Sequence, residues 1–131
     1  MGKKTTILLV EDDPALRDLI TLVINRKLKS DIEVISAANG EDALISLKRD
    51  QPDIMILDIL LPLMNGLQVI QKMKNEKIFE RTKIIVITAL GFKEVVQKVL
   101  NEGVNEFLVK PLNLDILCER IQRYIDNETG K

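Results

Sequence analysis

Side chains that can carry charge or hydroxyl chemistry follow four separate apolar runs, each at the point where the run ends. They are Glu11, Asp12 and Asp13, then Asp58, Thr88 and Lys110. In an open parallel α/β sheet, the carboxyl ends of the strands face one crevice, so residues at those ends converge although they are far apart in sequence. The sequence therefore predicts one site built from carboxylates, a hydroxyl and an ammonium.

The acidic residues of this set predict a cation site. Glu11, Asp12 and Asp58 would raise one another's pKa values if they met without a compensating charge. Mg²⁺ suits such an edge, because it keeps several waters and is usually held by one or two carboxylates. For Asp13, capping the next helix in front of Pro14 is a sufficient explanation. The alternative interpretation is that Glu11 is a solvated loop residue and that Asp58 begins a turn.

The predicted set supports phosphoryl chemistry. A carboxylate can attack phosphorus and form an aspartyl phosphate. The transfer needs mainly positioning and neutralisation of the phosphoryl oxygens, which a metal, an ammonium and a hydroxyl supply. Taken singly, Thr88 could be an ordinary strand-end threonine and Lys110 a surface lysine. Beside a metal-bound Asp58, the two form the expected complement.

Short apolar runs alternate with longer segments of helical period, which is typical of βαβ units. The predicted strands are Thr6–Val10, Glu33–Ala37, Ile54–Leu57, Lys83–Ile87 and Glu106–Val109. The predicted helices are a first one over about 14–28 and then Glu41–Arg49, Leu67–Lys77, Lys93–Asn101 and Asn113–Asp126. All strands but the second are nearly continuous apolar runs, as expected when both faces are covered, and the second is expected at an edge. Right-handed crossovers then give an α/β, doubly wound, five-stranded parallel sheet flanked by five helices.

Composition narrows the function classes. The 131 residues fit a single domain, with a core over about 5–126 and a polar tail over 127–131. The net charge of -1 gives no reason to expect binding to nucleic acid or to a membrane surface. No apolar stretch reaches the length of a membrane helix, so a cytoplasmic protein is expected. The single cysteine, Cys118, excludes an internal disulfide and is expected to be a small apolar helix residue rather than a reactive thiol.

Four ordered motifs make the sequence similar to a known family. They are ILLVEDD at 7–13, ILDILLPLMNG at 56–66, ITA at 87–89 and FLVKP at 107–111. Together they resemble the receiver domains of two-component response regulators, of which the single-domain chemotaxis regulator is the familiar structural example. The resemblance covers nearly the whole chain and implies a flavodoxin-like fold with strand order 2-1-3-4-5.

The resemblance also implies roles for the site residues. Asp58 would be the phosphoacceptor, and Mg²⁺ would be bound by Asp12, Asp58 and the main-chain carbonyl of Leu60, with Glu11 acting through water. Thr88 and Lys110 would contact the phosphoryl oxygens. Phe107 would change rotamer together with Thr88 as the switch, and the peptide bond before Pro111 would be cis.

The implied function is a phosphorylation-dependent signalling switch. A sensor histidine kinase or a histidine phosphotransfer protein would donate the phosphoryl group, and the fourth helix, last strand and fifth helix would form the output face for an unknown protein target. The chain would catalyse only its own phosphorylation and dephosphorylation, as a monomer or a weak homodimer. The apolar residues Val95, Val96, Val99 and Leu100 of the fourth helix are expected to be core rather than interface.

Some positions depart from common receiver patterns. Leu60 and Leu90 stand two residues beyond Asp58 and Thr88, where they would flank the path of the hydrolytic water. Two bulky apolar groups should neither orient nor readily admit that water, so slow self-dephosphorylation is expected. Asn65 stands where an aspartate is frequent and is expected to tolerate a left-handed turn before Gly66.

Two other function classes remain open. A Mg²⁺-dependent phosphohydrolase uses similar carboxylates, but it normally needs a second acid/base group and a substrate cap, and the chain contains no histidine. A receiver-like protein-binding module that is never phosphorylated is the other alternative. The complete set of acidic, hydroxyl and lysine residues argues against that module. Mg²⁺-dependent labelling distinguishes a phosphorylated receiver from the module, and turnover of a phosphoester substrate distinguishes the phosphohydrolase.

Overall fold

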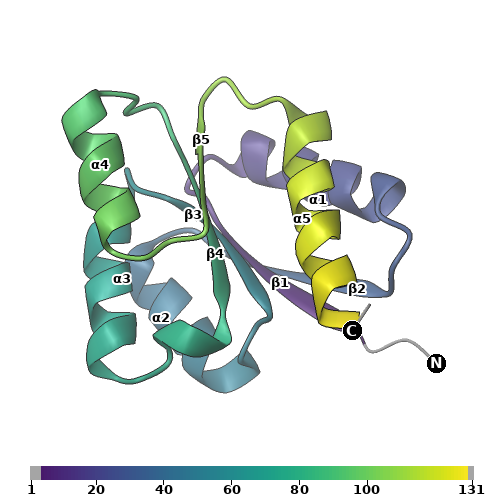
Figure 1. Ribbon diagram of the computed structural model, residues 1–131, viewed down its shortest axis with the longest axis horizontal. Helices are drawn as coiled ribbons and strands as arrows, with labels where there is room; N and C mark the ends of the chain where they lie inside the picture. Colours follow the sequence, from purple (N-terminus) through teal and green to yellow (C-terminus); the bar gives the residue numbers. More distant parts are fainter. Residues whose placement is uncertain (1–3, 130–131) are drawn as a thin grey trace.

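A parallel sheet in the order β2-β1-β3-β4-β5 forms the centre of the molecule, as the computed structural model of residues 4–129 shows (Figure 1). The strands are β1 Thr5–Val10, β2 Ile32–Ala37, β3 Ile54–Asp58, β4 Lys83–Thr88 and β5 Glu106–Val109. The helices are α1 Pro14–Lys27, α2 Gly40–Asp50, α3 Gly66–Asn75, α4 Lys93–Asn101 and α5 Leu114–Thr129, with a short 3₁₀ helix, η1, at Phe79–Arg81. The predicted flavodoxin-like order 2-1-3-4-5 is confirmed, with β2 at an edge, whereas η1 was not predicted. Part of the predicted polar tail, residues 130 and 131, lies outside the described residues.

Helices cover the sheet on both sides, which explains the continuous apolar runs. Figure 1 shows α1 and α5 on one face and α2, α3 and α4 on the other. Along β1, Leu8 and Val10 belong to the core cluster under α2 and α3, while Ile7 and Leu9 belong to the cluster under α1 and α5. Because successive strand side chains point to opposite faces, each strand serves both cores at once.

The helix starts show local reasons for their positions. Asp13 caps α1, as predicted, and its side chain accepts a hydrogen bond from the amide of Ala15 at 3.0 Å. Asn65 caps α3 through a capping box with Gln68, in which each side chain accepts from the other's amide. The left-handed residue of this turn is Leu63, with φ 68°, and not Asn65, so the expected role of Asn65 was wrong.

Helix α4 is less deeply packed than its sequence suggested. Val99 is fully buried and Val95 packs against the same core cluster, but Leu100 is 42% exposed. The apolar residues of α4 occupy two adjacent faces, and only one of them faces the sheet. The prediction that Leu100 is a core residue was therefore wrong.

Two further expectations can be compared with the structure. Cys118 lies in a helix, α5, as predicted, and the structure shows it buried, with 5% of its surface exposed. Among the helices of the described residues, none combines the length and the apolar character that crossing a bilayer demands.

Candidate functional site

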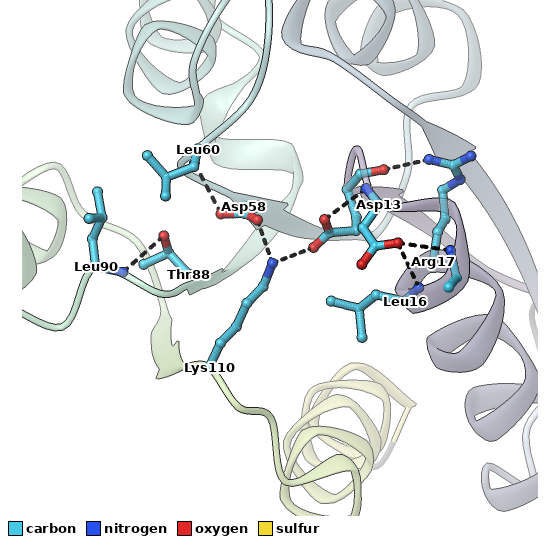
Figure 2. A network of polar contacts seen from close by, with 10 residues as sticks. Asp13, Leu16, Arg17, Asp58, Leu60, Thr88, Leu90 and Lys110 are labelled. Atoms are coloured by element: carbon cyan, nitrogen blue, oxygen red, sulfur yellow. Dashed lines mark hydrogen bonds and ion pairs between the residues drawn. The ribbon is translucent and has the colours of Figure 1, made fainter.

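The parallel register brings the carboxyl ends of four strands to one edge of the sheet. Val10 pairs with Leu57, Asp58 with Ile87, and Thr88 with Val109. The next residues along the chain after β1 and β5 are Glu11 and Lys110. Asp58, Thr88 and Lys110 thus lie near one another at this end of the sheet (Figure 2), which is where ligands bind in open α/β sheets.

The ammonium of Lys110 bridges two buried carboxylates. Its Nζ lies 2.8 Å from Glu11 Oε1 and 2.7 Å from Asp58 Oδ2. The Glu11 and Asp58 side chains are only 1% and 4% exposed, whereas that of Lys110 is 22% exposed. The bridge joins the ends of β1, β3 and β5, so three strands contribute to one ionic cluster.

The acidic residues form a group of suitable size for a cation. Oxygens of Glu11, Asp12 and Asp58 all lie within 4.8 Å of one another. Opposite ligands of an octahedral Mg²⁺ are about 4.2 Å apart, given metal–oxygen distances of about 2.1 Å. A carboxylate oxygen has a second lone pair, so the contacts with Lys110 do not prevent metal binding. The all-oxygen donor set therefore suits Mg²⁺, and the oxygen separations, at most 4.8 Å, are close to this span.

Main-chain groups fix the orientation of Asp58. Its Oδ1 accepts a hydrogen bond from the amide of Leu60 at 3.0 Å (Figure 2). The loop then folds back on itself, because the amide of Gly66 donates to the carbonyl of Ile59 at 2.9 Å. A Cβ at position 66 would lie 2.7 Å from the carbonyl oxygen of Asp58, so only glycine fits there without a shift of the backbone.

Burial and charge oppose each other in the pKa values of the cluster. Burial raises the pKa of Glu11 above its usual value, and the hydrogen bonds from Lys110 and from the Asp13 amide only partly offset this. Burial lowers the pKa of Lys110, but its hydrogen bonds to Asp58 and Glu11 outweigh burial, so the net shift is upward. The lysine therefore stays charged near neutral pH, where it neutralises part of the negative charge.

The proposed switch residues, Thr88 and Phe107, lie on β4 and β5. Thr88 is fully buried, and its Oγ1 accepts from the amide of Leu90 at 3.3 Å (Figure 2). Its main-chain carbonyl accepts from the amide of Lys110 at 2.8 Å, which ties β4 to the start of the last loop. Phe107 is half-buried against the core cluster that also contains Leu8, Val10 and Val99. The Lys110–Pro111 peptide bond is cis, as the resemblance implied.

Arg17 is a further residue of this site that the sequence pattern did not indicate. Arg17 of α1 donates from Nη1 to the main-chain carbonyl of Glu11 at 2.6 Å. The only signal in the sequence was a basic residue in the first turn of the helix that begins at the acidic motif. A charge at such a position is more often solvated, so the pattern alone did not single it out.

A family model described as the response regulator receiver domain matches residues 7–122, nearly the whole chain. The chain belongs to this family. It is 30% identical over 126 residues to the probable C4-dicarboxylate response regulator DctR of Bacillus subtilis, covering 93% of this chain and 53% of that protein. It is also 30% identical over 119 residues to the sporulation initiation phosphotransferase F of Bacillus subtilis, covering 91% of this chain and 92% of that one.

The fold agrees with that of solved receivers. The crystal structure of a CheY-like response regulator receiver domain protein from Methanospirillum hungatei matches with a TM-score of 0.83 and 25% identity, covering 98% of each chain. The receiver spans only about half the length of the DctR relative.

Proposed function

We propose that this receiver is a switch that accepts a phosphoryl group on Asp58 from a phosphohistidine of a sensor kinase or a phosphotransfer protein. The observation that carries the proposal is the position of Asp58. It ends a buried strand, its side chain is held between the Leu60 amide and the Lys110 ammonium, and it lies within the acidic group. A carboxylate so placed has a fixed direction and a nearby positive charge, as an acceptor in phosphoryl transfer requires.

The proposed step is a displacement at phosphorus. An oxygen of Asp58 attacks, the new P–O bond forms, and the P–N bond to the donor histidine breaks, with its electron pair returning to the imidazole nitrogen. The Lys110 ammonium, 2.7 Å from Asp58 Oδ2, lies where negative charge accumulates. Thr88 is proposed as the hydroxyl donor to the product. Mg²⁺ would neutralise negative charge on the phosphoryl oxygens. Its proposed ligands are Asp12, Asp58 and the Leu60 carbonyl, with Glu11 acting through water.

The proposed output is a change in the α4, β5 and α5 face. Phosphorylation adds nearly two negative charges and strong acceptors next to Thr88, which can favour one arrangement of the β4–α4 segment over another. Helix α4 is suited to such a shift, because Val99 is its single fully buried side chain and its N-cap, Phe92, makes no side-chain capping bond. Phe107 is the proposed aromatic partner of Thr88 in this change.

The partners follow from the same chemistry. The similarity to a phosphotransferase of nearly equal length favours a place in a phosphorelay, where the group passes onward to another histidine. Activity is expected on the chain itself and not on a separate substrate. Four further expectations stay predictions. They are a cytoplasmic location, a single domain over 1–131, no binding to nucleic acid or membranes, and a monomeric or weakly dimeric state.

The test is the intact-protein mass after incubation with acetyl phosphate, with and without Mg²⁺. The wild type should gain one phosphoryl group only with Mg²⁺, and Asp58→Asn should gain none. Asp13→Asn is the matched control, because asparagine also caps a helix and the exposed Asp13 carboxylate is not the proposed acceptor; it should label like the wild type. Absence of labelling in the folded wild type would instead favour the protein-binding module.

A further inference from the structure

The peptide that joins Glu11 to Asp12 is held from outside the loop. The carbonyl of this peptide, that of Glu11, accepts from Arg17 Nη1 at 2.6 Å. The amide of Glu11, which belongs to the preceding peptide, donates to the carbonyl of Ala37 at 3.1 Å. A peptide unit is planar, so fixing the Glu11 carbonyl also fixes the amide nitrogen of Asp12 and the direction in which its Cα leaves. The contact with Arg17 therefore orients the backbone under Asp12.

Asp12 depends on this backbone more than its neighbours do. Glu11 and Asp58 are buried and bonded to Lys110, whereas Asp12 is exposed. An exposed carboxylate receives little steric guidance from packing, so its place within the acidic group comes from the loop that carries it. This loop is only three residues long, between the end of β1 at Val10 and the start of α1 at Pro14.

Stabilisation of helix α1 does not explain why an arginine stands at position 17. It lies in the first turn of α1, where the helix dipole disfavours a positive charge. It is half-buried, and its guanidinium turns back toward the β1–α1 loop (Figure 2). Its position is explained by the bond to the Glu11 carbonyl.

We propose that Arg17 is a positioning residue for the cation site, which sets the Glu11–Asp12 peptide so that the Asp12 carboxylate faces the metal. The proposal rests on the proposed Mg²⁺ site. It makes a prediction opposite in sign to simple electrostatics. A nearby positive charge repels a cation, so if Arg17 acted only through its charge, removing it would tighten Mg²⁺ binding. If Arg17 positions Asp12, removing it weakens binding.

The test is calorimetric titration of Mg²⁺ into the folded chain at fixed ionic strength, for the wild type, Arg17→Met and Arg17→Lys. Groups that orient metal ligands typically contribute 10- to 100-fold in metal affinity. Arg17→Met should therefore raise the dissociation constant for Mg²⁺ by about tenfold. Arg17→Lys keeps the charge and a donor and should recover part of the affinity. Arg26→Met removes an exposed arginine near the other end of the same helix and should bind Mg²⁺ like the wild type.

Each result has a defined meaning. Arg17→Met binding Mg²⁺ as tightly as the wild type, or more tightly, would overturn the positioning role, as would an equal loss in Arg26→Met. The thermal unfolding midpoint with and without Mg²⁺ gives a second readout and shows whether each variant folds. If the wild type itself binds no Mg²⁺, the proposed metal site fails, and that failure is distinguishable from a failure of the Arg17 proposal.

Discussion

The side-chain ammonium of Lys110 lies 2.7 Å from Asp58 Oδ2, and the same nitrogen lies 2.8 Å from Glu11 Oε1. Two nearly buried carboxylates therefore share one positive charge. Each of them would be costly without a partner, because burial disfavours the charged form. The lysine proposed to hold the phosphoryl group thus also stabilises the folded site.

Removing this ammonium should destabilise the protein. Deleting one partner of a buried ion pair costs about 3–5 kcal/mol, and the partial exposure of Lys110 reduces that figure to about 2 kcal/mol. We expect Lys110→Met to lower the free energy of unfolding by about this amount, as measured by urea denaturation with a chelator present. Mg²⁺ should then stabilise the variant more than it stabilises the wild type, because the metal supplies the missing positive charge.

Lys72→Met is the control for this prediction. Lys72 is exposed on α3, so its replacement removes the same charge from a solvated position. Its unfolding free energy should stay within about 0.5 kcal/mol of the wild type. Equal losses in the two variants would show that the Lys110 bridge contributes little to stability.

Because Leu60 and Leu90 are apolar, we expect the phosphorylated state to be long-lived. Their amides donate to the Asp58 and Thr88 side chains respectively, so both leucines lie close to the acceptor (Figure 2). Neither leucine can orient a water for attack on phosphorus. We expect the labelled wild type to retain its phosphoryl group for minutes or longer, and Leu60→Asn to lose it about tenfold faster, because a positioned polar group assists the attacking water. Intact mass followed over time measures both rates.

Leu63→Asn separates this effect from a general change in the loop. Leu63 is 75% exposed in the same segment, and its φ of 68° is a conformation that asparagine tolerates better than leucine. The variant should fold at least as well as the wild type and dephosphorylate at the wild-type rate. Loss of label from the wild type within seconds at room temperature would contradict the prediction.

Two glycines near the site should differ in their tolerance of alanine. A Cβ at Gly66 would lie 2.7 Å from the carbonyl oxygen of Asp58 and 2.8 Å from the Cα of Ile59, both rigid backbone atoms. A Cβ at Gly91 would lie 3.2 Å from Val109 Cγ1, the end of a side chain. Overpacking costs about 1–3 kcal/mol, so Gly66→Ala should lose about 2 kcal/mol of unfolding free energy. Gly91→Ala should lose less than about 1 kcal/mol; an equal loss in both would contradict the steric argument.

The fold could be predicted because the strand signals were strong where both faces of the sheet are covered. In β3 and β4 every apolar side chain faces one of two helical layers, so the runs are continuous and their ends are sharp. Strand β2 was the weakest signal because it lies at the edge and is only partly covered. Helix α4 was harder, since Val95, Val96, Val99 and Leu100 span two faces and the sequence does not say which face meets the sheet.

The sequence was sufficient to predict which residues form the site, but not how these residues contact one another. The strand-end rule brings Glu11, Asp58 and Lys110 to one crevice, yet it does not tell that the lysine bridges both carboxylates or that Glu11 is buried. Those facts depend on side-chain rotamers and on the path of the last loop. The contact of Arg17 with a main-chain carbonyl was beyond the sequence for the same reason, because backbone acceptors leave no residue-type signal.

A final prediction concerns Tyr124, the single tyrosine in a chain without tryptophan. Its hydroxyl donates to Glu106 Oε2 at 3.2 Å, which joins α5 to β5. Burial, followed by the charge of Glu106 and this hydrogen bond, raises its pKa to about 12 from the ordinary 10.0. Because no other side chain contributes tyrosinate absorbance, a spectroscopic pH titration of the native protein reads this group alone.

The sign of the stability effect follows from the raised pKa. The folded state holds the Tyr124 proton more tightly than the unfolded chain, so the stabilising contribution is complete below about pH 10 and is lost as the pH rises toward 12. Glu106→Gln should move the titration down toward the ordinary value without reaching it, since burial persists. Glu94→Gln removes an exposed charge from α4 and should leave the titration unchanged. If Tyr124 of the wild type titrates near its ordinary pKa, the hydroxyl is not paired with Glu106, and the β5–α5 contact at the proposed output face is looser than the structure has it.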